Sequence, residues 1–495
     1  VVVVDRNCHK SVLHSIIMTG AIPVFLMPTR NHFGIIGPIP KSEFAWENIK
    51  KKIERNPFAN DKNAKPRVLT ITQSTYDGVL YNVEEIKDML DGKIDTLHFD
   101  EAWLPHATFH DFYGDYHAIG ADRPRCKESM VFSTQSTHKL LAGLSQASQI
   151  LVQDAQENRL DRDVFNEAYL MHTSTSPQYS IIASCDVAAA MMEAPGGTAL
   201  VEESLTEALD FRRAMRKVDE EWGADWWFKV WGPNDLSEEG LEERDAWMLK
   251  ANESWHGFGN LAEGFNMLDP IKATIITPGL DIHGDFSDEN GIPAAIVTKY
   301  LAEHGVIVEK TGLYSFFIMF TIGITKGRWN TMVAALQQFK DDYDKNQPLW
   351  KVLPEFVQKH PRYERVGLKD LCAQIHAVYK ANDVARLTTE MYLSDMVPAM
   401  KPTDAFAKMA HREIDRVAID ELEGRITAVL LTPYPPGIPL LIPGERFNKV
   451  IVNYLRFARE FNERFPGFET DVHGLVKGVV DGKSTYYVDC VRTEV

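Results

Sequence analysis

Short strand-like segments alternate with helix-like segments through about the first 190 of the 495 residues, and this alternation restricts the fold more than any other feature of the sequence. Six segments are short and rich in apolar or β-branched residues, as strands buried on both faces are. They are residues 1–5, 22–27, 67–73, 96–100, 130–134 and 149–152. Helix-like segments such as residues 10–19 and 83–90 lie between several of them. Because alternating strands and helices form a mostly parallel sheet covered on both faces, we expect an α/β fold.

A proline–glycine run marks the end of this first region. Pro195-Gly196-Gly197 interrupts regular structure, so we place a large domain at residues 1–196 and a C-terminal α+β region at residues 197–495, subdivided near residue 400. Within the second region, residues 273–276, 306–309 and 316–321 are strand-like and residues 329–399 are rich in helix-like segments.

The overall charge and the cysteines limit the kinds of partner. A formal net charge of −17 disfavours nucleic acid and anionic membranes. It favours a solvated acidic surface that aids solubility, or a cationic substrate. The five cysteines are scattered without a CxxC pair, which indicates a reducing compartment and neither a disulfide framework nor a zinc site. The apolar stretches are too short to span a bilayer. We therefore expect a cytoplasmic protein without a metal.

An acid and a lysine each follow a strand-like segment. Asp100 closes one such segment, and Lys139 follows another in Ser136-Thr137-His138-Lys139. Ligands of an open α/β sheet gather at the carboxyl ends of its strands, so these two side chains can converge on one ligand. Pyridoxal phosphate needs such a pair, an amine for an imine bond and an anion for the ring nitrogen. Each residue also has an ordinary explanation, since Asp100 can cap a turn and Lys139 can lie on the surface at a helix start.

Two further segments suit the same cofactor. His9 also comes just after a strand-like segment, where its ring can stack on a flat cofactor or serve as a structural histidine. Residues 173–176 form a hydroxyl-rich loop before a helix-like run. Such a loop suits phosphate recognition, although a plain helix cap explains it as well.

Taken together, these segments resemble the large bacterial lysine/arginine/ornithine decarboxylases, which are fold type I pyridoxal phosphate enzymes. The matching stretches cover nearly the whole chain and are residues 5–11, 73–78, 98–103, 133–149, 172–179, 308–312, 433–445 and 466–474. The resemblance implies the aminotransferase-like sheet of fold type I and pyridoxal 5'-phosphate as cofactor. It implies α-decarboxylation of a basic amino acid, first L-lysine to cadaverine, with L-arginine to agmatine or L-ornithine to putrescine as alternatives. It also implies a role in polyamine metabolism or acid stress.

The resemblance assigns catalytic roles to individual residues. Lys139 would form the imine with the cofactor, and Asp100 would pair with the ring nitrogen. His9 would stack over one face of the ring, with Ala102 on the other. Either His138 or Lys139 would supply the proton that replaces the carboxylate; the sequence leaves this open.

The remaining roles that the resemblance implies lie around the cofactor. Ser136 and His138 would contact its phosphate, and Thr75 and Trp103 would line the site. The loop with Thr173, Ser174 and Thr175 would reach the cofactor of a neighbouring subunit, so we expect a homodimer or a higher oligomer such as a decamer. Glu309 would contact the distal cation of the substrate.

The family also carries an amino-terminal wing domain and a phosphate-binding loop before its first strand. We expect the present chain to correspond to the part after the wing domain.

Two other functions stay open. A fold type I aminotransferase would share Asp100 and Lys139 but would need an arginine that clamps the α-carboxylate. A catalytically silent scaffold subunit would bind no cofactor.

Overall fold

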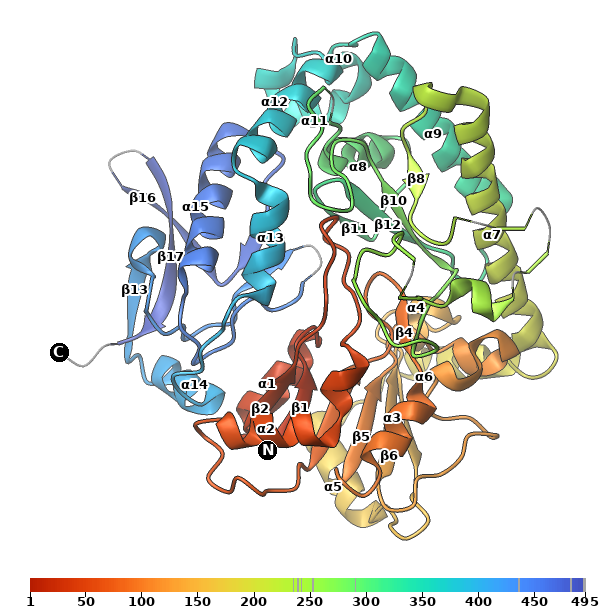
Figure 1. Ribbon diagram of the computed structural model, residues 1–495, viewed down its shortest axis with the longest axis vertical. Helices are drawn as coiled ribbons and strands as arrows, with labels where there is room; N and C mark the ends of the chain where they lie inside the picture. Colours follow the sequence, from red (N-terminus) through yellow and green to blue (C-terminus); the bar gives the residue numbers. More distant parts are fainter. Residues whose placement is uncertain are drawn as a thin grey trace.

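The structure is a computed structural model of residues 1–495, and it describes all of them except 235, 238–239, 242, 252, 290, 435–436, 481–482 and 493–495. Its first region is a six-stranded sheet in the order β2-β1-β3-β5-β6-β7, drawn in red and orange at the bottom of Figure 1. The strands are β1 (Val2–Asp5), β2 (Pro23–Leu26), β3 (Val68–Thr72), β5 (Thr96–Asp100), β6 (Met130–Gln135) and β7 (Gln149–Gln153). All pairs are parallel except β6 with β7, so the predicted α/β fold is confirmed.

Helices cover both faces of this sheet because successive strand residues point to opposite sides. Val3 packs with α2 (Trp46–Arg55) and α3 (Val83–Leu90) in one apolar cluster. Val4 packs in another with α1 (Lys10–Thr19). The helices α1 and α3 begin and end where the sequence predicts.

The chain continues through short and long helices into a second, antiparallel sheet. The helices are α4 (Thr137–Leu140), α5 (Arg162–His172), α6 (Tyr179–Met191), α7 (Gly196–Trp222), α8 (Ala294–Glu303) and α9 (Lys326–Asp344). The sheet has the order β11-β12-β10-β8 and consists of β8 (Lys229–Val230), β10 (Lys272–Ile276), β11 (Lys310–Thr311) and β12 (Ser315–Met319). A separate pair joins β4 (Val79–Tyr81) to β9 (Asn266–Leu268), which ties the first region to the second.

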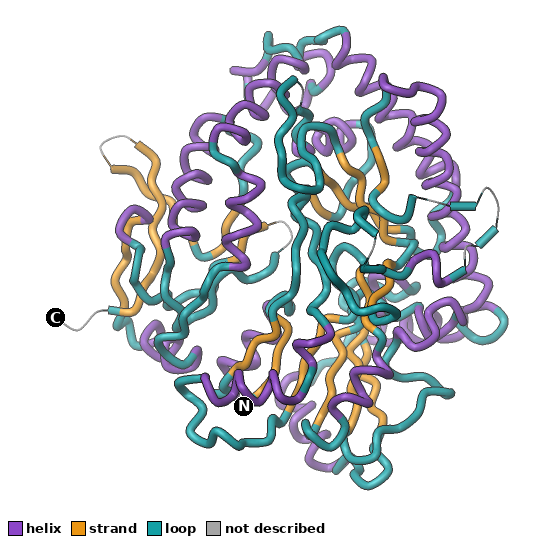
Figure 2. The backbone as a smooth tube through the Cα atoms, in the orientation of Figure 1, coloured by secondary structure: helices purple, strands orange, loops and turns teal. Residues whose placement is uncertain are grey.

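Helices and two small sheets form the last part of the chain. The helices are α10 (Leu349–Val352), α11 (Pro354–Lys359), α12 (Leu368–Ala381), α13 (Val384–Leu393), α14 (Pro402–Ala410) and α15 (Lys449–Arg464). The strands are β13 (Ile414–Ala418), β14 (Thr432–Tyr434), β15 (Asp471–His473), β16 (Leu475–Val480) and β17 (Lys483–Val491). Figure 2 shows α13 and α15 as neighbouring purple helices beside the orange strands β13, β16 and β17.

One predicted strand is wrong in position. Residues 306–309 are not a strand, and β11 begins only at Lys310. Val306 donates its backbone N–H to Leu301, in the last turn of α8, so this segment still completes the helix end. Pairing with β12 starts where Lys310 lies opposite Phe317. The division of the chain near residues 196 and 400 stays a prediction.

Two features are absent from the described residues. No helix among them is both long enough and apolar enough to cross a membrane. In the same residues, no group of three or more His, Cys, Asp or Glu side chains is arranged to hold a metal ion.

Candidate active site

A cavity of about 650 Å³ lies at the carboxyl ends of β3, β5 and β6. This is the edge at which parallel strands of an α/β sheet present their ligand-binding loops. Seven of the predicted site residues line the cavity: His9, Thr75, Asp100, Ala102, Trp103, Ser136 and Lys139. Sequence positions far apart are brought together because β3, β5 and β6 are neighbours in the sheet.

The Asp100 side chain lies at the end of β5 and is held by a backbone N–H of the turn that follows the strand. Its Oδ1 accepts a hydrogen bond from the backbone N–H of Ala102 at 3.2 Å. Two residues earlier, the His98 ring lies between the hydroxyls of Thr70 on β3 and Thr134 on β6, at 3.2 and 3.0 Å. Burial lowers the pKa of His98, while the Asp100 charge opposes that shift. Both the His98 ring and the Asp100 carboxyl group line the cavity.

Lys139 reaches the cavity from the short helix α4, which follows β6. Its Nζ lies 4.3 Å from the centroid of the Trp103 ring. Burial lowers its pKa, against the opposing charges of Asp100 and Glu309. Within the described part of the chain, neither a hydrogen bond nor an ion pair engages this Nζ. A half-buried amine without a carboxylate partner loses its proton more readily, as an imine-forming lysine requires.

His9 and Thr75 also serve local structure. His9 is the N-cap of α1, where its Nδ1 lies 2.8 Å from the Ser11 hydroxyl, and its exposed ring still lines the cavity. The Thr75 hydroxyl accepts from the Val79 backbone N–H at 3.0 Å and donates to the Ile36 carbonyl at 3.4 Å.

Three predictions concern residues that do not line the cavity. The His138 Nδ1 lies 2.8 Å from the Ala147 carbonyl oxygen. Residues 173–175 follow α5 and are partly or fully exposed, away from this chain's own cavity. Glu309 is exposed near the rim, where its carbonyl accepts from the Tyr76 hydroxyl at 3.3 Å. The roles of these residues stay predictions.

Asp5 is a further acid at the carboxyl end of β1; the sequence places it at a strand end, but sequence reasoning gave it no role in the site. Asp5 is 1% exposed, and burial raises its pKa to about 6. Its carboxylate accepts from the backbone N–H groups of Asn7 at 2.7 Å and Thr72 at 3.4 Å. Its place at a strand end was the signal that could have identified it.

Lys272 was also missed, and nothing in its local sequence marks it. This fully buried side chain donates from Nζ to the Ser74 hydroxyl at 2.6 Å and to the Trp103 carbonyl at 3.0 Å. Burial lowers its pKa to about 8. Lys272 thereby holds the backbone of the residue whose ring contacts Lys139.

The cavity residues fit pyridoxal phosphate. A carboxylate, an amine without an ionic partner, a histidine ring and the hydroxyl of Ser136 surround one space. These are the groups that the cofactor's ring nitrogen, aldehyde carbon, aromatic face and phosphate require.

Comparisons with known proteins agree with this geometry. The family profile described as Orn/Lys/Arg decarboxylase, major domain, matches residues 1–328, and the profile of the C-terminal domain of these decarboxylases matches residues 385–492. Lysine decarboxylase LdcA of Pseudomonas aeruginosa is 51% identical over 99% of this chain and 66% of its own length. The biodegradative arginine decarboxylase of Escherichia coli is 40% identical over 99% of this chain and 67% of its own length.

A solved structure of a lysine decarboxylase is similar to this chain over nearly its whole length. Lysine decarboxylase A from Pseudomonas aeruginosa matches with a TM-score of 0.94 and 51% identity, over 99% of this chain and 66% of that one. The chain therefore spans about two thirds of the length of the relatives that it matches.

Proposed function

We propose that this chain, which belongs to the Orn/Lys/Arg decarboxylase family, removes the α-carboxylate of a basic amino acid with pyridoxal phosphate. The family uses this cofactor, and the cavity holds the groups that it requires. When bound, the cofactor would accept the electron pair that the departing carboxylate leaves behind.

Four residues would hold the cofactor. Asp100 would keep its ring nitrogen protonated through an ionic contact. His9 and Ala102 would contact its two faces, and Ser136 its phosphate. Each of these residues lines the cavity, which supports their assignment.

Lys139 would act twice. Its amine would first bind the cofactor covalently and then, once released by the substrate amine, stand ready beside the substrate Cα as a proton donor. Contact with the Trp103 ring keeps this amine at the cavity. We favour Lys139 over His138 as the donor because the Nδ1 of His138 lies 2.8 Å from a carbonyl oxygen and its side chain does not line the cavity.

The lining of the cavity supports decarboxylation over amino transfer. Among the described residues that line it, Lys139 is the only lysine, and no arginine is present to clamp an α-carboxylate. Arg30 donates to Asn7 at 3.1 Å, but its guanidinium lies 3.8 Å from the centroid of the Tyr392 ring. A carboxylate that must leave as carbon dioxide is better left without such a clamp.

L-Lysine is our first choice of substrate, because a relative that is 51% identical bears the name lysine decarboxylase. L-Arginine and L-ornithine are the alternatives, and an arginine decarboxylase is 40% identical. Glu309 would receive the distal cation, since its charge acts on the Lys139 amine at the cavity.

We also propose a homodimer, with a decamer as a higher assembly. The helices α5 and α6 flank residues 173–175 and carry an exposed apolar surface that a second copy could cover. Its exposed side chains are Val164, Tyr169, Leu170, Met171, Tyr179, Ile182 and Val187. Burial of this surface against a second copy would bring Thr173, Ser174 and Thr175 to the partner's cofactor.

A cytoplasmic location and a role in acid stress or polyamine metabolism complete the proposal. All five cysteines are free, as suits a reducing compartment. Decarboxylation consumes a proton and releases an amine, so the reaction raises the surrounding pH.

Product analysis tests this function. The purified chain with added pyridoxal phosphate should release carbon dioxide and the matching amine from lysine, arginine or ornithine, without forming a keto acid. A keto acid would support the aminotransferase alternative. No product, together with no cofactor absorbance band, would support the silent scaffold.

A further inference from the structure

A buried ammonium from the second region joins two loops behind the cavity. Lys272 on β10 is 1% exposed, and its Nζ donates to the Ser74 hydroxyl at 2.6 Å and to the Trp103 carbonyl at 3.0 Å. Ser74 lies in the loop after β3, and Trp103 lies in the loop after β5. The Asp269 carboxylate lies 3.6 Å from the same Nζ. One ammonium, which has three N–H donors, therefore faces an acceptor in each loop and a carboxylate.

The two loops carry aromatic rings that pack against each other at the cavity. Tyr76 lies in the same loop as Ser74, and the centroid of its ring lies 5.2 Å from that of the Trp103 ring. Both aromatic residues line the cavity, and the Trp103 ring centroid lies 4.3 Å from the Lys139 Nζ. Lys272 therefore holds both loops of a ring pair, and one member of that pair contacts the amine that would bind the cofactor.

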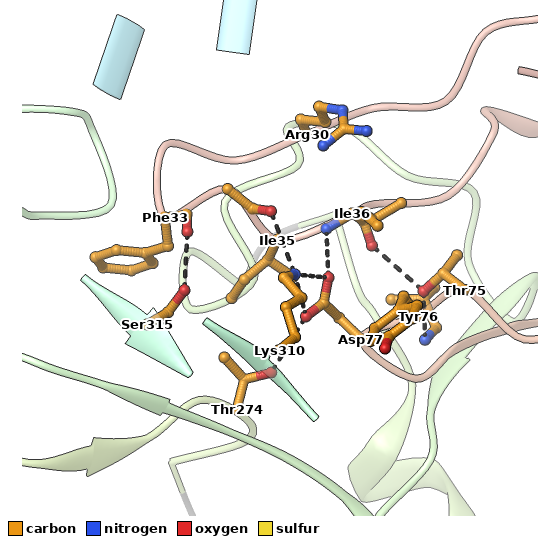
Figure 3. Close-up of polar contacts among 12 residues, drawn as sticks. Arg30, Phe33, Ile35, Ile36, Thr75, Tyr76, Asp77, Thr274, Lys310 and Ser315 are labelled. Atoms are coloured by element: carbon orange, nitrogen blue, oxygen red, sulfur yellow. Dashed lines mark hydrogen bonds and ion pairs between the residues drawn. The ribbon is translucent and has the colours of Figure 1, made fainter. Parts of the chain in front are cut away.

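Other contacts also fix the first of these loops to the second region (Figure 3). The Lys310 Nζ lies 2.6 and 2.7 Å from the two carboxylate oxygens of Asp77, and the Thr274 hydroxyl donates to the same carboxylate at 3.5 Å. These contacts do not depend on the Lys272 ammonium. When that ammonium is removed, we therefore expect Trp103 to shift and residues 74–78 to stay in place.

Asp269 keeps the buried lysine charged. Its Oδ1 accepts from the Tyr113 hydroxyl at 2.8 Å, and the His106 Nε2 lies 3.6 Å from its Oδ2. Burial lowers the pKa of Lys272 to about 8, the charge of Lys139 acts in the same direction, and the charge of Asp269 opposes both. Because a buried ammonium without a carboxylate loses its proton readily, Asp269 supports the charged hydrogen bonds of Lys272.

We propose that Lys272, paired with Asp269, is a positioning residue that holds the Trp103 ring against the Lys139 amine and so keeps this amine reactive. The inference rests on the proposed function, in which Lys139 binds the cofactor. Lys272 touches neither cofactor nor substrate in this account and acts through Trp103.

The Trp103 ring affects the Lys139 amine mainly by covering it. Burial lowers the pKa of Lys139, although the charges of Asp100 and Glu309 oppose that shift and the face of the ring attracts an ammonium. A ring that moves away would let water reach the amine, and hydration favours its charged, unreactive form. Loss of Lys272 should therefore raise the pKa of Lys139.

Acetylation of the protein without cofactor measures this effect apart from turnover. Acetic anhydride reacts with the neutral amine, and peptide mass spectrometry reports how far Lys139 is labelled at each pH. The ratio of its labelling at pH 7.5 to its labelling at pH 10 cancels differences in accessibility and follows the pKa of the amine.

Two variants remove or weaken the Lys272 contacts. Lys272→Met with Asp269→Asn removes both charges, which buried pairs often tolerate, and the amide can still accept from Tyr113. This double variant should lower the labelling ratio about three- to tenfold. Asp269→Asn alone is a milder change that weakens the charged hydrogen bonds, and it should lower the ratio about twofold.

Two further variants show whether the effect passes through the ring. In a Trp103→Ala background, adding the double substitution should change the ratio by less than about twofold, because no ring is left to position. The matched control is Lys87→Met. Lys87 is a buried lysine on α3 that donates to the Glu84 carboxylate and the Ala118 carbonyl, outside the described lining of the cavity. This control should keep the wild-type ratio.

Three outcomes would overturn the inference. One is that the folded variants, with unchanged circular dichroism spectra, keep the wild-type ratio. Another is an equal fall of the ratio in the Trp103→Ala background, which would assign the effect to charge alone. The third is the same fall in Lys87→Met, which would assign it to lost stability. If the ratio falls as expected but the cofactor binds another lysine, the proposed role of Lys139 fails and its coupling to Lys272 stands.

Discussion

The buried carboxyl of Asp5 makes stability depend on pH in a direction that one substitution can isolate. Burial raises its pKa from the ordinary value of 3.8 to about 6. This difference corresponds to about 3 kcal/mol. Between pH 3.8 and 6 the folded chain binds this proton more tightly than the unfolded chain does. The contribution of Asp5 to the free energy of unfolding therefore falls by about 3 kcal/mol as pH rises through this window, and below pH 3.8 the cost is absent.

Asp5→Asn removes this dependence because an amide does not titrate. Any change in the hydrogen bonds from Asn7 and Thr72 is the same at every pH and cancels when differences are compared. The stability of the variant relative to wild type should therefore rise by about 3 kcal/mol between pH 4 and pH 7. For a chain of 495 residues this is about 3 °C in melting temperature.

Calorimetric melting of both proteins at pH 4, 5, 6 and 7 is the assay. The quantity to follow is the difference between the two melting temperatures at each pH. The reasoning that burial dominates at this carboxyl would be refuted by a difference that stays constant from pH 4 to pH 7. It would also be refuted if the melting temperature of the variant fell relative to wild type as pH rises.

The remaining predictions concern single residues. Asp100→Asn should lower the rate of carbon dioxide release by orders of magnitude in a folded protein, because an amide cannot hold the ring proton by charge; a near-normal rate would remove Asp100 from the mechanism. Arg6→Met leaves Glu445, its partner at 2.9 Å, buried and uncompensated, and should cost about 3–5 kcal/mol in denaturant unfolding. Gly37→Ala would put a Cβ too close to the Thr29 hydroxyl and should lower stability by about 1–3 kcal/mol in the same assay.

Elements whose structure depends on residues close together in the chain could be predicted from the sequence. The strands of the first sheet were predictable because each is a brief segment rich in apolar or β-branched residues, even in β7, the largely exposed strand at one edge. Convergence of Asp100 and Lys139 followed from the rule that ligands meet at the carboxyl ends of strands, and it required β5 and β6 to be neighbours, as they are.

Long-range contacts were beyond such reasoning. The Asp77–Lys310 pair joins positions 233 residues apart, and no local pattern marks either residue. The strand β4 has only three residues and exists because it pairs with β9, far along the chain. Lys272 has a Lys-x-Thr sequence typical of a surface strand, yet its ammonium is buried beneath Trp103. In each case tertiary pairing, rather than local propensity, decides the outcome.

The most direct test of the account is to identify the lysine that binds the cofactor. Borohydride reduction of the protein with pyridoxal phosphate, followed by peptide mass spectrometry, reports that residue. The account predicts a stable phosphopyridoxyl group on Lys139 and none in Lys139→Ala. A group on another lysine, such as the buried Lys272, with Lys139 unmodified would contradict it.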